Sequence, residues 1–172
     1  MIPGMTDSPA NLLCKACGLC CSGHLFSWVR LDANELDNVE KLGLRVIRDD
    51  PRQRGFMQPC PVWDGTCTVY TSPDYPRSCK RYKCKVFRQL LDNDLSFPDA
   101  MTVIQETLTL IREIEPLLPG PSSVSFRERL IAHKEEMESL GELNNEFMKN
   151  TTILLARYED LFGVDDFMDY ET

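Results

Sequence analysis

The sequence predicts an α+β protein in which a small cysteine-rich unit with a short hairpin precedes a mostly helical unit. All eight cysteines lie in residues 1–95, which have a net charge of +2, whereas residues 96–172 have a net charge of −10. Apolar residues recur at helical spacing in the second part, while short alternating and turn-rich segments make up the first. We therefore expect two structural units, residues 1–95 and 96–172, that join near residues 92–98.

The first unit is expected to contain short elements. Residues 1–13 are interpreted as a loose arm, and the Cys- and Gly-rich residues 14–21 as turns. Weak alternation of apolar residues predicts a short strand within residues 25–31. A helix is predicted over residues 33–42, because a capping-box-like pair precedes it and a glycine follows it. Residues 44–59 are expected to form strand and loop segments.

An Asp-Gly pair at residues 64–65 predicts a hairpin, because both residues tolerate the positive φ of a two-residue turn. In this register Trp63 pairs with Thr66. The sulfurs of Cys60 and Cys67 then lie on the same face as diagonal neighbours. This arrangement suits two ligands of one metal ion.

The second unit shows three apolar stripes at helical spacing. They predict helices over residues 101–118, 126–140 and 143–161. Proline and glycine residues from Pro116 to Pro121 are expected to end the first helix. The three helices would form a helical hairpin or a small bundle.

The cysteines are the strongest chemical feature of the chain. Four of them form a C-x2-C-x2-C-C run, in which each C-x2-C turn lets two thiolates converge on one metal. Four thiolates saturate either a tetrahedral zinc ion or an iron–sulfur cluster, so eight cysteines suit two four-ligand sites, or one site with spare thiols. The predicted metal ligands are Cys14, Cys17, Cys20, Cys21, Cys60, Cys67, Cys79 and Cys84.

An even number of cysteines also fits a disulfide framework. Two observations count against it: the first residues carry no secretory signal, and the adjacent Cys20 and Cys21 have awkward geometry for disulfides. Zinc is the preferred metal because it suits C-x2-C turns. Iron or an iron–sulfur cluster is the alternative, because C-x2-C-x2-C resembles the first three ligands of bacterial ferredoxins. His24 is interpreted as a surface or supporting residue, with metal ligation as the alternative.

Three blocks of the sequence together resemble a known family. They are CKACGLCC at residues 14–21, CPVWDGTCTVY at residues 60–70 and PRSCKRY at residues 76–82. In order and spacing they resemble the CxxCxxCC, or YkgJ-type, cysteine-cluster family of zinc- or iron-chelating domains. Tyr75 stands where the family usually has arginine, and Cys84 matches less firmly than the other cysteines. The resemblance implies a chelated metal, and it implies no particular activity.

The predicted function is therefore a metal-binding protein whose metal is structural. One alternative is an iron–sulfur redox protein or a metal-dependent enzyme with an open metal position. Another is a metal-trafficking protein or a thiol redox sensor. Whether the protein is an enzyme stays open: the sequence contains no phosphate-binding glycine loop, no G-x-S-x-G and no H-E-x-x-H motif. No catalytic residue and no organic cofactor are predicted.

The expected partners follow from charge. The acidic helical unit suggests a protein partner, and a pI of about 4.8 argues against general binding to nucleic acid. The basic residues between Lys80 and Arg88 are interpreted as a solvated turn or as a contact with the acidic unit. No apolar run is long enough for a membrane helix. A reduced, cytoplasmic location is expected for a protein with these thiols.

Overall fold

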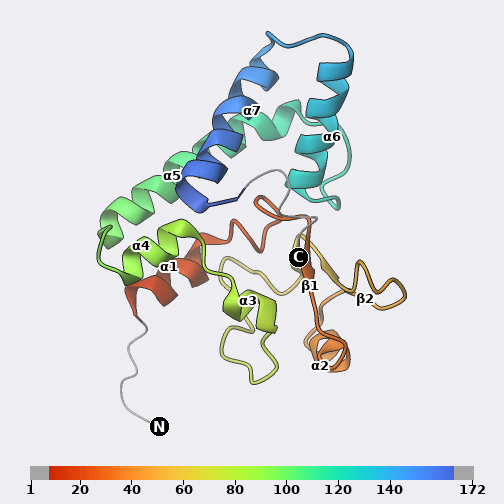
Figure 1. Ribbon diagram of the computed structural model, residues 1–172, viewed down its shortest axis with the longest axis vertical. Coiled ribbons are helices and arrows are strands. Elements are labelled where there is room, and N and C mark those ends of the chain that lie inside the picture. The colour runs from red at the N-terminus through yellow and green to blue at the C-terminus, as the bar shows by residue number, and fades with distance from the viewer. Residues whose placement is uncertain (1–7, 165–172) are drawn as a thin grey trace.

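A computed structural model describes residues 8–164 (Figure 1). It confirms the α+β class, with a small antiparallel sheet and a mostly helical C-terminal part. In chain order the elements are α1 (Pro9–Cys17), β1 (Trp28–Arg30), α2 (Leu36–Lys41), β2 (Val46–Ile47), β3 (Gly55–Met57), α3 (Arg77–Arg81), α4 (Lys85–Leu91), α5 (Phe97–Ile114), the 3-10 turn η1 (Glu115–Leu117), α6 (Phe126–Ser139), α7 (Glu146–Arg157) and the π-helical turn η2 (Tyr158–Phe162).

Helix α1 replaces the predicted arm and part of the predicted turns. The Ser8 hydroxyl caps it by accepting a hydrogen bond from the Asn11 amide (3.2 Å), and Gly18 ends it at φ 70°. Both are ordinary helix-boundary signals. The prediction of a loose arm was wrong over residues 9–13, because Ala10 and Leu13 are buried in the core and hold the helix. Residues 1–7 of that arm lie outside the described residues.

The sheet has the order β1-β3-β2, with β3 antiparallel to both neighbours. Phe56 at its centre pairs with Val29 on one side and Val46 on the other. Gly55 is required in β3, because a Cβ there would collide with the Val29 carbonyl oxygen and the Trp28 ring. The strands predicted within residues 25–31 and 44–59 are therefore present, although they are short.

The register of the predicted hairpin was wrong by one residue. A single antiparallel bridge pairs Trp63 with Cys67 rather than with Thr66, so the loop contains three residues. Gly65 lies in the left-handed region at φ 70°, which suits a three-residue hairpin loop. The Thr68 amide (3.3 Å) and hydroxyl (2.5 Å) both donate to the Val62 carbonyl and hold this register.

The three predicted C-terminal helices are present as α5 with η1, α6, and α7 with η2. Each begins at a capping side chain: Ser96 for α5, Ser125 for α6 and Asn145 for α7. Helix α5 ends before Pro116, as expected of a residue that cannot continue the hydrogen-bond ladder. None of the helices within residues 8–164 is long and apolar enough to cross a membrane.

Buried side chains form two separate cores. The smaller core lies under the sheet and α2 and contains Leu31, Leu36, Val39, Leu44 and Phe56. The larger core combines α1 and α4 with α5, α6, α7 and η2. Figure 1 shows α1 and α4 beside the lower end of α5, with the sheet and α2 on the other side of α3. The larger core therefore includes residues from both sides of the expected join near residues 92–98.

Candidate metal centre

The eight predicted ligands come from four parts of the fold. Two lie on α1, two in the turn that follows it, two in the loop before α3, and two on or next to α3 and α4. The cysteines in these positions are, in that order, Cys14 and Cys17, Cys20 and Cys21, Cys60 and Cys67, and Cys79 and Cys84. All eight are free, and only Cys14 belongs to the exposed residues.

Four of the thiols are neighbours where α1 packs against α4. We call Cys14, Cys17, Cys20 and Cys84 the helix-side group. Cys14 is exposed as a residue, but its sulfur is partly shielded from solvent. That desolvation, followed by the neighbouring Cys84 thiol, raises the pKa of Cys14 to about 11. Burial also raises the pKa of Cys17 to about 12, with added contributions from Cys84 and Cys14. These thiols therefore influence one another, and Cys17, Cys20 and Cys84 also pack against the same larger core.

The other four thiols are neighbours beside the sheet. We call Cys21, Cys60, Cys67 and Cys79 the loop-side group. The Cys60 amide donates to the Cys21 carbonyl (2.6 Å), which ties the turn after α1 to the loop before α3. Burial, followed by Cys60 and Cys67, raises the pKa of Cys79 to about 12. Burial also raises the pKa of Cys21, and Cys60 and Cys67 add to it.

Cys14 lies between the two groups. Its pKa responds to Cys84 of the helix-side group and then to Cys67 of the loop-side group. It also contributes to the raised pKa values of Cys21 and Cys79. The two groups are therefore adjacent. Cys14 links them, and so do Cys20 and Cys21, because Cys21 adds to the raised pKa of Cys20.

Backbone amides face the sulfurs of three cysteines in the same way. The Phe87 amide donates to the Cys84 sulfur (3.4 Å), because Cys84 is the cap of α4. Burial raises the pKa of each of these cysteines, and the amides two and three residues later partly offset that rise, since a hydrogen bond favours the charged form. The three cysteines with their amides are Cys60 with Val62 and Trp63, Cys67 with Val69 and Tyr70, and Cys84 with Val86 and Phe87.

Two buried tyrosine hydroxyls next to the helix-side group have no hydrogen-bond partner. They belong to Tyr82, whose pKa is raised by burial and then by Cys20 and Cys84, and to Tyr158, on which Cys20 also acts. A buried hydroxyl without an acceptor is unfavourable by about 1–3 kcal/mol. A thiolate sulfur drawn closer by a bound metal could accept from such a donor, whereas burial favours the neutral thiols in the metal-free chain. Sequence position could have indicated Tyr82, two residues before Cys84, but nothing in the sequence indicated Tyr158.

The sulfurs are neighbours without being arranged as ligands. Within residues 8–164, no group of three or more His, Cys, Asp or Glu side chains is placed so that it could hold a metal ion. The donor chemistry of both groups nevertheless fits a thiolate-binding metal, since each supplies the four sulfurs that such a metal requires.

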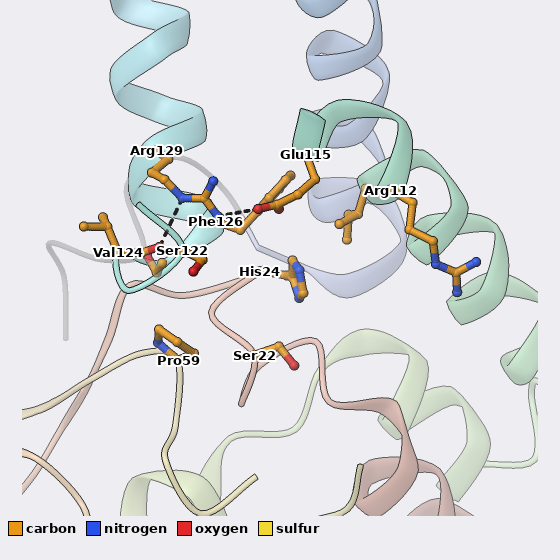
Figure 2. A pocket seen from close by; sticks show the side chains of 11 residues that line it. Ser22, His24, Pro59, Arg112, Glu115, Ser122, Val124, Phe126 and Arg129 are labelled. Carbon is orange, nitrogen blue, oxygen red and sulfur yellow. Dashed lines mark hydrogen bonds and ion pairs between the residues drawn. The ribbon is translucent and has the colours of Figure 1, made fainter. Parts of the chain in front are cut away.

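His24 lies apart from both groups. It faces a pocket of about 290 Å³ whose lining contains no cysteine, between the turn after α1 and the start of α6 (Figure 2). Its ring packs against Phe126 (5.1 Å between centroids), and the pocket also holds the Arg129–Glu115 ion pair (2.6 Å). Burial lowers the pKa of His24 to about 4, so the ring is neutral. His24 thus packs against Phe126 and lies away from the cysteines.

The basic residues around Cys79 and Cys84 are largely exposed. One of them makes the predicted contact with the helical part: the Lys85 ammonium donates to the Asp160 carbonyl (2.7 Å). This bond joins α4 to η2, whose Tyr158 and Phe162 belong to the larger core.

No protein-family model, curated protein or solved structure matches the chain. The resemblance of residues 14–84 to the CxxCxxCC family therefore stays a prediction. The functional argument depends on the cysteines themselves and on their surroundings.

Proposed function

We propose that the protein binds metal ions through its eight cysteines and that the metal is structural. The observation that supports this most strongly is the gathering of all eight thiols into two adjacent groups. Cysteines without a shared role would have no reason to meet from four separate parts of the fold. The amides that face Cys60, Cys67 and Cys84 add to the argument, because they favour thiolate, the form that binds metal.

Metal binding would change the sulfur positions. The raised pKa values belong to the metal-free chain, in which burial and mutual repulsion keep the thiols protonated. A divalent cation would remove the repulsion, displace the protons and draw the sulfurs of each group together. Zinc is the preferred metal, since it forms closed tetrahedral sites with four thiolates. Iron or an iron–sulfur cluster is the alternative, because it takes the same ligands.

A structural role follows from where the ligands lie. Between β3 and α3 the chain runs through about twenty residues without regular secondary structure apart from the Trp63–Cys67 bridge. Ligands within this loop and at both its ends would hold it against the sheet and α1. Because such sites do not exist in the unfolded chain, metal binding adds directly to folding free energy.

The decisive experiment is elemental analysis of protein purified without oxygen, followed by thermal unfolding before and after chelation. We expect stoichiometric zinc in colourless protein and a clear fall in Tm once the metal is removed. The control is the variant with all eight cysteines replaced by serine, which should bind no metal and show no response to chelator. Absence of stoichiometric metal would contradict metal binding. An unchanged Tm after verified removal would contradict the structural role, and a brown iron-containing protein would replace zinc by an iron–sulfur cluster.

The net charge of the helical part suggests the kind of partner, and the free cysteines suggest the compartment. The helical part has a net charge of −10 and exposes Leu140 (62%) and Leu143 (56%) near the connection between α6 and α7. We propose a basic protein as its partner, because opposite charge steers association. A reducing compartment such as the cytoplasm would keep the eight cysteines free for metal.

A further inference from the structure

We propose that the helix-side group and the loop-side group are two separate four-thiolate metal sites, each of which holds its own ion. This inference deepens the proposed function and rests on it. The sequence alone left open whether the cysteines share one site, and which of them belong together. The fold supplies a division.

The helix-side site is built on two packed helices. Cys14 and Cys17 are three residues apart on α1, so they lie on one face of that helix. The left-handed Gly18 ends α1, and Cys20 follows two residues later in the turn. Cys84 is the N-cap residue of α4, and α4 packs against α1. Cys17, Cys20 and Cys84 all pack against the larger core.

The loop-side site is built around the sheet instead. The Cys60–Cys21 backbone hydrogen bond and the Trp63–Cys67 bridge bring three of its members together. Cys79 comes from α3, which is attached to β1 by a hydrogen bond from the Ser78 hydroxyl to the Arg30 carbonyl (2.5 Å). Both Cys60 and Cys79 pack against the smaller core. Each proposed site is thus anchored to a different core.

The division separates cysteines that are close in sequence. Cys20 and Cys21 are adjacent, yet Cys20 packs against the larger core while the Cys21 carbonyl is bonded to Cys60. Cys79 and Cys84 are five residues apart, yet they belong to different helices and different cores. Cys14 is assigned to the helix-side site because it shares a face of α1 with Cys17, although it also lies next to the other group.

Paired serine variants test the division directly. Wild-type protein and variants are loaded with zinc without oxygen, and bound zinc is counted by native mass spectrometry. We expect two zinc ions in the wild type and one in either C79S or C84S. The informative comparison is between two double variants. C60S/C79S removes two ligands of one proposed site and should keep one zinc, whereas C79S/C84S removes one ligand from each site and should keep none.

The outcomes separate this inference from the proposed function. A wild type that binds no metal at all would contradict both. A wild type with only one zinc would overturn the division alone, as would a C79S/C84S variant that keeps zinc or a C60S/C79S variant that loses all of it. Retention of helical circular dichroism shows that a variant has folded.

A second measurement on the wild type does not depend on any variant folding. Zinc is removed partially with a chelator, the one-zinc species is treated with an alkylating reagent, and labelled cysteines are identified by peptide mass spectrometry. Molecules with one zinc should be labelled at the four cysteines of one group and protected at the four of the other. Labelling that mixes the two groups within the one-zinc species would overturn the division.

Discussion

The indole ring of Trp63 covers Gly18 at the end of α1. A Cβ on Gly18 would overlap the six-membered part of that ring, and Gly18 also has a positive φ of 70°. The loop before α3 therefore packs directly on the turn that carries Cys20 and Cys21. This contact holds the two stretches of chain on which most of the cysteines lie.

Replacement of Gly18 by alanine should be strongly destabilising. The left-handed backbone alone should lower the free energy of unfolding by about 1 kcal/mol. The collision with Trp63 should bring the total loss of unfolding free energy, measured in urea, to roughly 2–4 kcal/mol. Gly65→Ala is the matched control, because Gly65 has the same φ of 70° and no atom lies near its absent Cβ. It should lose only about 1 kcal/mol. Equal losses in the two variants would show that Trp63 does not press on Gly18.

The effect of Tyr82→Phe should depend on metal. In the metal-free protein the variant should be neutral or slightly more stable, because it removes a buried hydroxyl that lacks an acceptor. With metal bound, the hydroxyl can donate to a thiolate sulfur, so the variant should lose about 1 kcal/mol. Thermal unfolding with and without zinc measures both states.

Tyr70→Phe serves as the control for that comparison. The Tyr70 hydroxyl donates to the Asn11 side chain (2.9 Å), so its removal should have a similar cost of about 1 kcal/mol with and without metal. If Tyr82→Phe behaved in the same metal-independent way, its hydroxyl would have no role beside the helix-side group.

His24 should make the metal-free protein sensitive to acid. Burial, modified by Glu115 and Arg129, lowers the pKa of His24 from 6.5 to about 4, so the folded protein resists the proton that the unfolded chain accepts. The neutral ring therefore contributes stability above pH 6.5, and this is lost as the pH falls toward 4. The free energy of unfolding should fall by about 3 kcal/mol over this pH range.

Urea unfolding between pH 7 and pH 4 on metal-free protein measures this loss. The His24→Phe variant should show a flatter profile, because phenylalanine fits the apolar contact with Phe126 and does not titrate. His133→Gln, at the other histidine of the chain, should keep the steep profile. A His24→Phe profile as steep as that of the wild type would assign the acid sensitivity to other groups.

The shared core predicts that the two ends of the chain unfold together. Leu13 on α1 and Leu154 on α7 lie in the same buried cluster, although they belong to different units by composition. Either leucine replaced by alanine should lower the free energy of unfolding by about 2–5 kcal/mol. Tryptophan fluorescence, which reports on Trp28 and Trp63, and helical circular dichroism should give one coincident transition in both variants. Two separate transitions would favour independent units.

Much of the helical part could be predicted from the sequence, because local patterns determine it. The apolar stripes of α5 and α7 bury one face, whereas α6 buries only Phe126, Arg127 and Leu130 near its start. The helices start and stop at serine, asparagine and proline signals. Helix α1 was missed although it has the same signals, because the density of cysteine and glycine after Leu13 outweighed them. The hairpin was placed correctly and its loop length was not, since one residue of register costs little in a short exposed loop.

For the candidate site too, one part could be predicted from the sequence and another part could not. From spacing and chemistry, the sequence predicts the eight cysteines as metal ligands, and this stays a prediction. Its composition also distinguishes the cysteine-rich part from the acidic helical part. Only the tertiary structure decided which thiols are neighbours, because this depends on how α1 packs on α4 and how the loop before α3 lies on the sheet. It also decided that α1 and α4 share a core with the C-terminal helices. Sequence distance carries no record of this: adjacent Cys20 and Cys21 fall in different groups, whereas Cys17 and Cys84 pack against the same core.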